Sequence, residues 1–206
     1  MTVPNHLADF PAGDAPVPAL LFAPGQSYRM HRPIPVQLAQ HVVPRGIAVF
    51  RFDWTAPGAE AADLRAMLAM LRSDPRVDVR NIWIGGKSLG SVMAWQLLAD
   101  EPALRGAVLL TPICTPPDGD ADGPYPGIDA ERRPLLFLSG AEDRLCEPAA
   151  LYRFAARAPG AVRVDVIAGG HDLGGEAGAE LAGRLVADFL GSHCHHDEAH
   201  AASPHA

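Results

Sequence analysis

Apolar residues along the chain fall into two kinds of run. Short, mostly apolar runs of the kind that buried strands show lie at 20–23, 47–52, 79–84, 107–110, 135–138 and 162–167. Longer segments between them repeat apolar residues at helical spacing, at 33–43, 59–71, 89–99, 149–158 and 177–190. The pattern therefore predicts six strands that alternate with helices.

This alternation predicts the fold class. Apolar strands separated by helices pair in parallel, and right-handed crossovers then place helices on both faces of an open, doubly wound, mainly parallel α/β sheet. We expect this domain to span residues 1–190. The segment 114–133, rich in Pro, Gly and Asp, is expected to be an exposed excursion, and the His-rich residues 191–206 a disordered tail.

Composition narrows the class of function. A chain of 206 residues with a formal net charge of -7 has no electrostatic reason to bind nucleic acid or an anionic membrane. No apolar run reaches the roughly 18 residues of a membrane span, and the first residues lack the features of a secretory signal. We expect a soluble, cytoplasmic protein that acts on a small molecule, while its oligomeric state is left open.

The cysteines support the same interpretation. Cys114, Cys146 and Cys194 lie far apart and without a C-x-x-C spacing. This usage suits a reducing compartment and argues against a disulfide framework.

The stretch Ile84-Gly85-Gly86-Lys87-Ser88-Leu89-Gly90-Ser91 contains parts of two motifs. A phosphate-binding P-loop requires a glycine five positions before Gly86, where this chain has Asn81, and an apolar strand fills the positions between them. The G-x-S-x-G motif instead requires a strand, a sharp turn at the serine and a helix, which is the predicted order here. Ser88 is therefore the candidate nucleophile.

Two later residues complete a catalytic triad in the order serine, acid, histidine. Asp143 follows the predicted strand 135–138 and His171 follows 162–167, so both lie at the carboxyl edge of the sheet. An imidazole is needed to take the proton from the serine, and a carboxylate to orient that imidazole. The backbone N–H groups of Gln26 and Leu89 are the predicted oxyanion hole.

Other polar residues compete for a role near this site. Asp53 ends another predicted strand and Glu142 adjoins Asp143, so both are alternative acids. Lys87 is the single lysine of the chain, and we expect it to form a salt bridge beside the nucleophile.

Two segments resemble metal sites. Asp118 to Gly123, with Asp129, mimics a calcium loop, but helices do not flank it, and we interpret it as a solvated acidic turn. The histidines of the C-terminal segment could capture zinc or nickel opportunistically. We predict no cofactor and no catalytic metal.

Taken together, these motifs resemble the small α/β-hydrolases of the dienelactone-hydrolase-like type, over about residues 18–190. The resemblance is carried by the segments 21–25, 50–53, 85–90, 136–140 with Asp143, and 169–171. It implies an α/β-hydrolase fold with a minimal cap. This chain departs from the usual fold at its start, where the opening antiparallel strands are missing or confined to the first 16 residues.

The resemblance also implies a function. It implies hydrolysis of an ester or related acyl bond through an acyl-enzyme on Ser88, without a cofactor. Dienelactone hydrolases proper have a cysteine as nucleophile, so their substrate is not implied. This branch is also similar to hydrolase-like subunits of chromatin-modifying complexes, which leaves a scaffold role as an alternative. A thioesterase or peptidase with the same triad is another.

Overall fold

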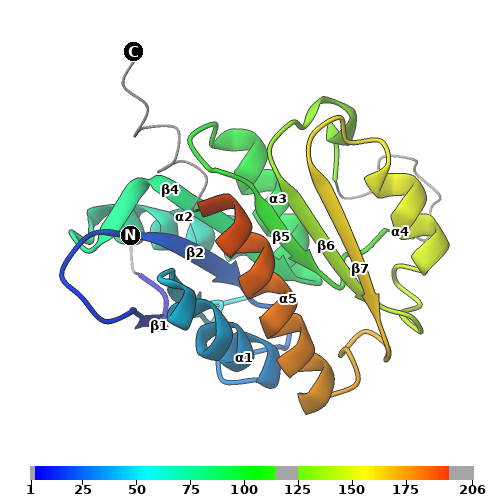
Figure 1. Ribbon diagram of the computed structural model, residues 1–206, viewed down its shortest axis with the longest axis horizontal. Coiled ribbons are helices and arrows are strands. Elements are labelled where there is room, and N and C mark those ends of the chain that lie inside the picture. Colours follow the sequence, from blue (N-terminus) through cyan, green and yellow to red (C-terminus); the bar gives the residue numbers. More distant parts are fainter. Residues whose placement is uncertain (1–2, 115–124, 195–206) are drawn as a thin grey trace, which may run out of the picture.

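The computed structural model describes residues 3–114 and 125–194, which form a single mainly parallel sheet (Figure 1). Its strands are β1 (His6–Asp9), β2 (Val17–Ala23), β3 (Ala48–Phe52), β4 (Val77–Lys87), β5 (Ala107–Leu110), β6 (Leu135–Gly140) and β7 (Val162–Ile167). They lie in the order β1-β3-β2-β4-β5-β6-β7. Strand β1 runs antiparallel to β3 and the other neighbours pair in parallel, which confirms the predicted fold class.

Helices cover both faces of the sheet. In Figure 1, α1 (Pro33–Val42) and α5 (Glu176–Cys194) lie side by side in front of the strands, and α2 (Glu60–Ser73) and α3 (Leu89–Asp100) lie behind them. Helix α4 (Pro148–Ala155) packs on the α2 and α3 side. Short 3-10 turns span Val43–Arg45 and Ile128–Ala130. Because side chains of a strand alternate between faces, the strands from β2 to β7 contribute to two separate cores.

The described residues form seven strands, one more than predicted. The additional strand, β1, is short, and its four residues alternate between exposed and half-buried. An edge strand of this kind has no continuous apolar run, so the apolar pattern does not reveal it. It lies within the first 16 residues, where the family resemblance allows an opening antiparallel strand.

Helix α5 is longer than predicted. It continues past Gly191 to Cys194, whose side chain is buried at 5% exposure. The predicted disordered tail from residue 191 is therefore wrong for residues 191–194, and residues 195–206 lie outside the described part of the chain.

The predicted exposed excursion 114–133 is corrected in its described part. Tyr125 and Ile128 are each 0% exposed, because they pack into the core on the α2 and α3 side of the sheet. Asp129 forms an ion pair with Arg157, whose Nε lies 2.9 Å from Oδ1 of Asp129. The rest of the proposed calcium loop, residues 118–123, lies outside the described residues.

Cys114 and Cys146 form a disulfide, which corrects the expectation of unpaired cysteines. The two residues are 32 positions apart in sequence, but each follows one of the neighbouring parallel strands β5 and β6. Spacing along the chain does not reveal this proximity, because it arises from the order of strands in the sheet.

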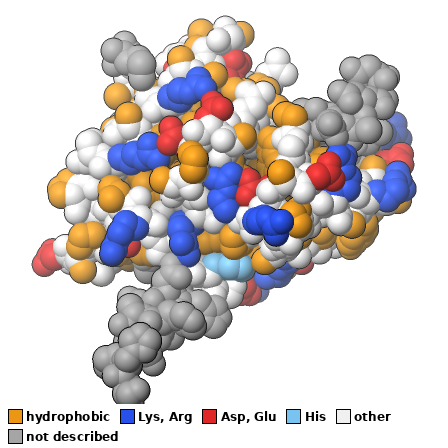
Figure 2. All heavy atoms as spheres, turned by 90° about the horizontal axis from the view of Figure 1, so that it is seen from above, with side chains coloured by type: hydrophobic (Ala, Val, Ile, Leu, Met, Phe, Trp, Pro, Cys, Tyr) orange, Lys and Arg blue, Asp and Glu red, His pale blue; other side chains and the backbone are white. Residues whose placement is uncertain are grey.

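The molecular surface has mixed charge. Figure 2 shows basic side chains scattered over one face among acidic, apolar and uncharged groups rather than gathered in one patch. Within residues 3–114 and 125–194, no helix combines the length and apolar character needed to cross a membrane.

Candidate active site

Strand β4 ends in a sharp turn that carries Ser88. This residue has φ 52° and ψ -118°, and α3 begins at the next residue. A positive φ is uncommon for a residue with a side chain and marks local strain, which is frequent at active sites. We call residues 86–90 the elbow.

The glycines of the elbow are required by close backbone packing. A Cβ on Gly90 would lie 2.2 Å from the carbonyl oxygen of Ala23, and one on Gly86 would lie 2.1 Å from the carbonyl oxygen of Gly90. No side chain fits at either position, so α3 approaches the ends of β2 and β4 closely enough to hold the strained turn.

The structure brings the three predicted catalytic side chains together. The Oγ of Ser88 lies 2.8 Å from Nε2 of His171, and Nδ1 of His171 lies 2.8 Å from Oδ2 of Asp143. In the tautomer that carries its proton on Nδ1, the imidazole donates to the carboxylate and accepts from the serine hydroxyl. This arrangement can remove the proton from Ser88.

Asp143 is buried and fully engaged. Its carboxylate accepts hydrogen bonds from the Ser139 hydroxyl at 3.2 Å and from the Leu145 N–H at 2.9 Å, in addition to His171. Burial raises the pKa of the Asp143 carboxyl, but the hydrogen bonds from His171, Leu145 and Ser139 outweigh that effect, and the pKa lies below its ordinary value. Asp143 is therefore held ionised, as the orienting role requires.

The two competing acids lie elsewhere. Asp53 accepts the Met30 N–H at 2.8 Å, and Glu142 is exposed. Among the described residues, the carboxylate that hydrogen-bonds to His171 is that of Asp143.

The turn of residues 24–28, which we call the β2 turn, lies against the elbow. A Cβ on Gly25 would lie 3.7 Å from Cβ of Ser88, and the Tyr28 N–H donates to the Gly25 carbonyl at 3.2 Å. Gln26 follows Gly25 and is exposed. Leu89 is the first residue of α3, where backbone N–H groups have no partner within the helix. Both residues predicted to supply the oxyanion hole thus lie beside Ser88.

A hydrogen-bond network on the α3 side also holds the elbow, and the sequence did not indicate it. The Ser91 hydroxyl donates to the Ser88 carbonyl at 2.5 Å and lies 2.7 Å from the Tyr125 hydroxyl, which accepts the Ile113 N–H at 2.8 Å. Burial raises the pKa of Tyr125, so its hydroxyl stays protonated. Ser91 lies in the segment 84–91 that carries the G-x-S-x-G motif, but nothing in the sequence pairs it with Tyr125.

Lys87 makes a different contact from the predicted salt bridge. Its side chain is 4% exposed, and Nζ lies 4.9 Å from the centre of the Tyr28 ring. Within the described residues it forms no ion pair at salt-bridge distance, so a cation–π contact replaces the expected one. Burial lowers the pKa of Lys87 to about 8, and the negative charges of Asp143 and Asp172 offset part of that effect.

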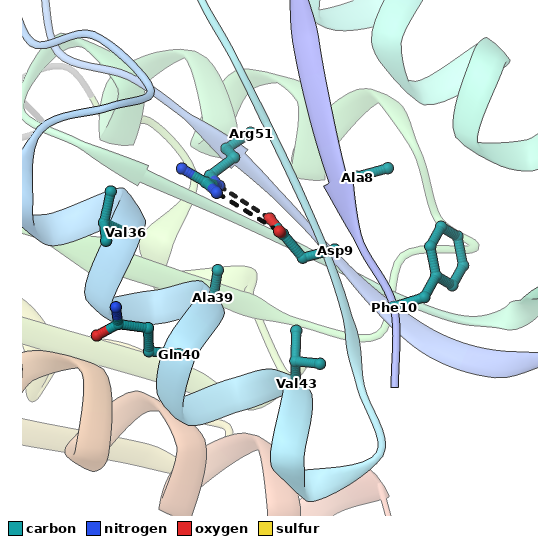
Figure 3. Close-up of a pocket in the computed structure, with 8 residues that line it drawn as sticks. All are labelled: Ala8, Asp9, Phe10, Val36, Ala39, Gln40, Val43 and Arg51. Atoms are coloured by element: carbon teal, nitrogen blue, oxygen red, sulfur yellow. Dashed lines mark hydrogen bonds and ion pairs between the residues drawn. The ribbon is translucent and has the colours of Figure 1, made fainter. Parts of the chain in front are cut away.

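Two hollows are candidates for binding a substrate. The larger, of about 560 Å³, lies between β1, β3 and α1, where the side chains of Arg51 and Asp9 point toward each other in an ion pair (Figure 3). Its lining residues belong neither to the elbow nor to the β2 turn. The smaller, of about 210 Å³, is lined by the β2 turn with Asp53 and Trp54, and so it adjoins the elbow. The smaller hollow is the better candidate for a substrate.

Metal ligands are not grouped in the described part of the chain. Within residues 3–114 and 125–194, no three His, Cys, Asp or Glu side chains are placed to hold a metal ion. The predicted His-rich segment lies largely outside those residues.

Comparison with known proteins shows the family of the chain. The model of the alpha/beta hydrolase domain family matches residues 16–182, so the chain belongs to that family. No curated protein matches the chain significantly.

Solved structures with the same fold include esterases. Est1E from Butyrivibrio proteoclasticus, solved with ferulic acid bound, has a TM-score of 0.75 at 15% identity, covering 90% of this chain and 93% of its own. The esterase domain of a Rhodothermus marinus protein has a TM-score of 0.71 at 18% identity, covering 90% and 91%. An alpha-beta serine hydrolase homologue from Coxiella burnetii has a TM-score of 0.67 at 18% identity, covering 91% and 90%. These likenesses establish the fold.

Proposed function

We propose that the protein is a serine hydrolase that cleaves an ester or related acyl bond of a small substrate. The observation that carries this proposal is the continuous chain of hydrogen bonds from Ser88 through His171 to Asp143, with both contacts at 2.8 Å. It occurs at the strained turn of a G-x-S-x-G motif, in a chain of the alpha/beta hydrolase domain family.

The geometry supports a two-stage reaction. The Ser88 oxygen attacks the substrate carbonyl carbon while its proton passes to Nε2 of His171. The N–H groups of Gln26 and Leu89 stabilise the oxyanion, and the imidazolium then gives its proton to the leaving alcohol. Water, activated by the same imidazole, releases the acyl group and restores Ser88. The reaction requires no cofactor.

The hollow that adjoins the elbow favours a small acyl group. The hollow beside the β2 turn, of about 210 Å³, is small compared with typical drug-sized sites of roughly 300–1,000 Å³. The esterase names of structural neighbours support an ester in preference to an amide. Within the family, the motif residues support the small dienelactone-hydrolase-like type, in a branch that has a serine in place of the cysteine nucleophile.

Two alternatives share the fold. A scaffold role would leave the triad residues free to drift apart, whereas here they lie at hydrogen-bond distance. A thioesterase or peptidase would use the same triad and differ in substrate.

The proposed absence of nucleic-acid and membrane partners rests on the net charge of the chain. A cytoplasmic location stays a prediction, and the Cys114–Cys146 disulfide removes cysteine usage as its support.

A series of p-nitrophenyl esters with increasing acyl length tests this proposal. We expect turnover to be fastest with short acyl chains, and Ser88→Ala and His171→Ala each to lose about a thousandfold or more in kcat. Ser73→Ala is the matched control, because Ser73 is an exposed serine that bonds to the Met70 carbonyl at the end of α2. Undiminished turnover by Ser88→Ala, or no turnover of any ester by the folded wild type, would contradict the proposal.

A further inference from the structure

Lys87 is a buried charge that the proposed chemistry does not use. It ends β4, directly before the nucleophile, and its ammonium faces groups from several loops. Tyr28 presents its ring from the β2 turn, and Arg32 stacks on the same ring at 5.4 Å. The negative charges that act on the ammonium are those of Asp143, after β6, and Asp172, after β7, next to His171.

Tyr28 connects this charge to the β2 turn. Its N–H donates to the Gly25 carbonyl at 3.2 Å, and its Cβ lies 3.2 Å from where a Gly25 side chain would begin. Its hydroxyl accepts the Ile34 N–H at the start of α1 at 3.2 Å. The ring is thus fixed at one end by α1 and at the other by the turn that carries Gln26. A force on the ring therefore acts on the position of that turn.

We propose that Lys87 is a positioning residue: while its ammonium is charged, it holds Tyr28, and with it the β2 turn, against the elbow. A charged ammonium is attracted to the face of an aromatic ring, whereas a neutral amine is not. Burial raises the pKa of Tyr28, so the ring remains neutral over the range in which Lys87 titrates. This inference rests on the proposed function, because the β2 turn matters through the Gln26 N–H.

The sign of the pH dependence follows from the lysine. Its pKa is about 8, so the ammonium is charged below that pH and neutral above it. Oxyanion stabilisation then weakens as the pH rises through 8. Because the oxyanion exists only in the reaction's high-energy states, the loss falls on kcat and leaves KM nearly unchanged. We expect an alkaline decrease of about three- to tenfold, the size of a partly buried cation–π contact.

Kinetic pH profiles of lysine and tyrosine variants test the proposal. The wild type should lose kcat with a midpoint near pH 8. Lys87→Met should lack this decrease. Its kcat should lie, at every pH, near the lowered kcat that the wild type reaches at high pH. Lys87→Arg should also lack it, because a guanidinium stays charged. Tyr28→Phe keeps the ring and should retain the decrease, whereas Tyr28→Leu should lose it.

Arg80→Met is the matched control for loss of a cation. Arg80 lies on the same strand as Lys87, but its side chain is 89% exposed and pairs with Asp78. Its replacement should leave the alkaline decrease in place. If Lys87→Met and Lys87→Arg both retain the decrease near pH 8, the proposal is wrong.

A measurement without turnover separates this inference from the proposed function. Lys87 is the single lysine of the chain, so a protein labelled with ¹³C-lysine gives one Cε signal. Its titration midpoint should lie near pH 8 in the wild type and lower in Tyr28→Leu, because the ring favours the charged form. A midpoint near 10.5, the ordinary pKa of a lysine, or one that Tyr28→Leu leaves unchanged, overturns the inference. If the wild type hydrolyses no ester, the proposed function fails, while this titration still decides whether the contact exists.

Discussion

The elbow is held from its two sides by contacts of different kinds. On the α1 and α5 side, the charged Lys87 stacks on Tyr28. On the α2 and α3 side, the neutral hydroxyls of Ser91 and Tyr125 connect the Ser88 carbonyl to the Ile113 N–H. Both contacts reach the backbone at or next to Ser88, the proposed nucleophile, yet they differ in how they respond to pH.

This difference separates stability from function. Hydrogen bonds between neutral, buried groups stabilise the fold at every pH at which neither partner ionises. A buried ammonium without an ion pair is unfavourable for folding, because it loses its hydration and gains no close counter-charge in exchange. A chain that retains such a group beside its proposed nucleophile is less stable there than it could be, and such a loss of stability is common at active sites.

Gly90→Ala should have the largest effect, because it disturbs both sides at once. Its Cβ would lie 2.2 Å from the Ala23 carbonyl oxygen, so α3 and β2 must separate. We expect a loss of about 4 kcal/mol or more in the free energy of unfolding, measured by urea denaturation. Gly191→Ala, also in a helix but with its nearest neighbour 3.5 Å away, is the control and should not destabilise. Equal stability of the two variants would contradict the packing argument.

Lys87→Met should stabilise the protein below pH 8. There the lysine is protonated in both the folded and the unfolded state, and the folded state bears the full cost of burying the charge. Since the pKa falls from 10.5 to about 8 on folding, that cost is up to about 3 kcal/mol.

The advantage of this variant should disappear at higher pH. Between pH 8 and 10.5 the unfolded chain binds a proton that the folded protein lacks, so wild-type stability rises with pH. Urea denaturation at pH 7 and at pH 10.5 measures both limits. A variant that is less stable than the wild type at pH 7 would show that Lys87 serves the fold rather than the site.

Tyr125→Phe should have a smaller effect that does not depend on pH. The change leaves the Ile113 N–H and the Ser91 hydroxyl without their shared partner, which typically costs about 1–3 kcal/mol. Because burial raises the pKa of Tyr125, the loss should be equal at pH 6 and pH 9. A loss that changes across this range would place a titrating group in the network.

The sequence predicted the parts of the site that depend on local signals. The strand, turn and helix around Ser88 are encoded within a few residues. The carboxyl ends of parallel strands meet at one edge of the sheet, so Asp143 and His171, which follow two such strands, were expected near Ser88. Their geometry agrees with that expectation. Other contacts between distant segments, away from the strand ends that carry the triad, were not predictable in this way.

Those missed contacts share a physical cause. Tyr125 reaches Ser91 from a segment whose Pro and Gly content is typical of exposed loops, and Cys114 meets Cys146 through the order of the strands. Lys87 was expected to pair with a carboxylate. That prediction failed because the sequence does not show that the ring of Tyr28 lies against its ammonium. Such contacts depend on the three-dimensional arrangement of elements rather than on spacing along the chain.

The central claim is that Ser88 is an activated nucleophile, and covalent labelling with a fluorophosphonate tests it most directly. Mass spectrometry of the labelled protein should show one adduct, located on the peptide that contains Ser88, and no adduct in Ser88→Ala. An unlabelled wild type, or labelling of Ser88→Ala to the same extent, would contradict the claim.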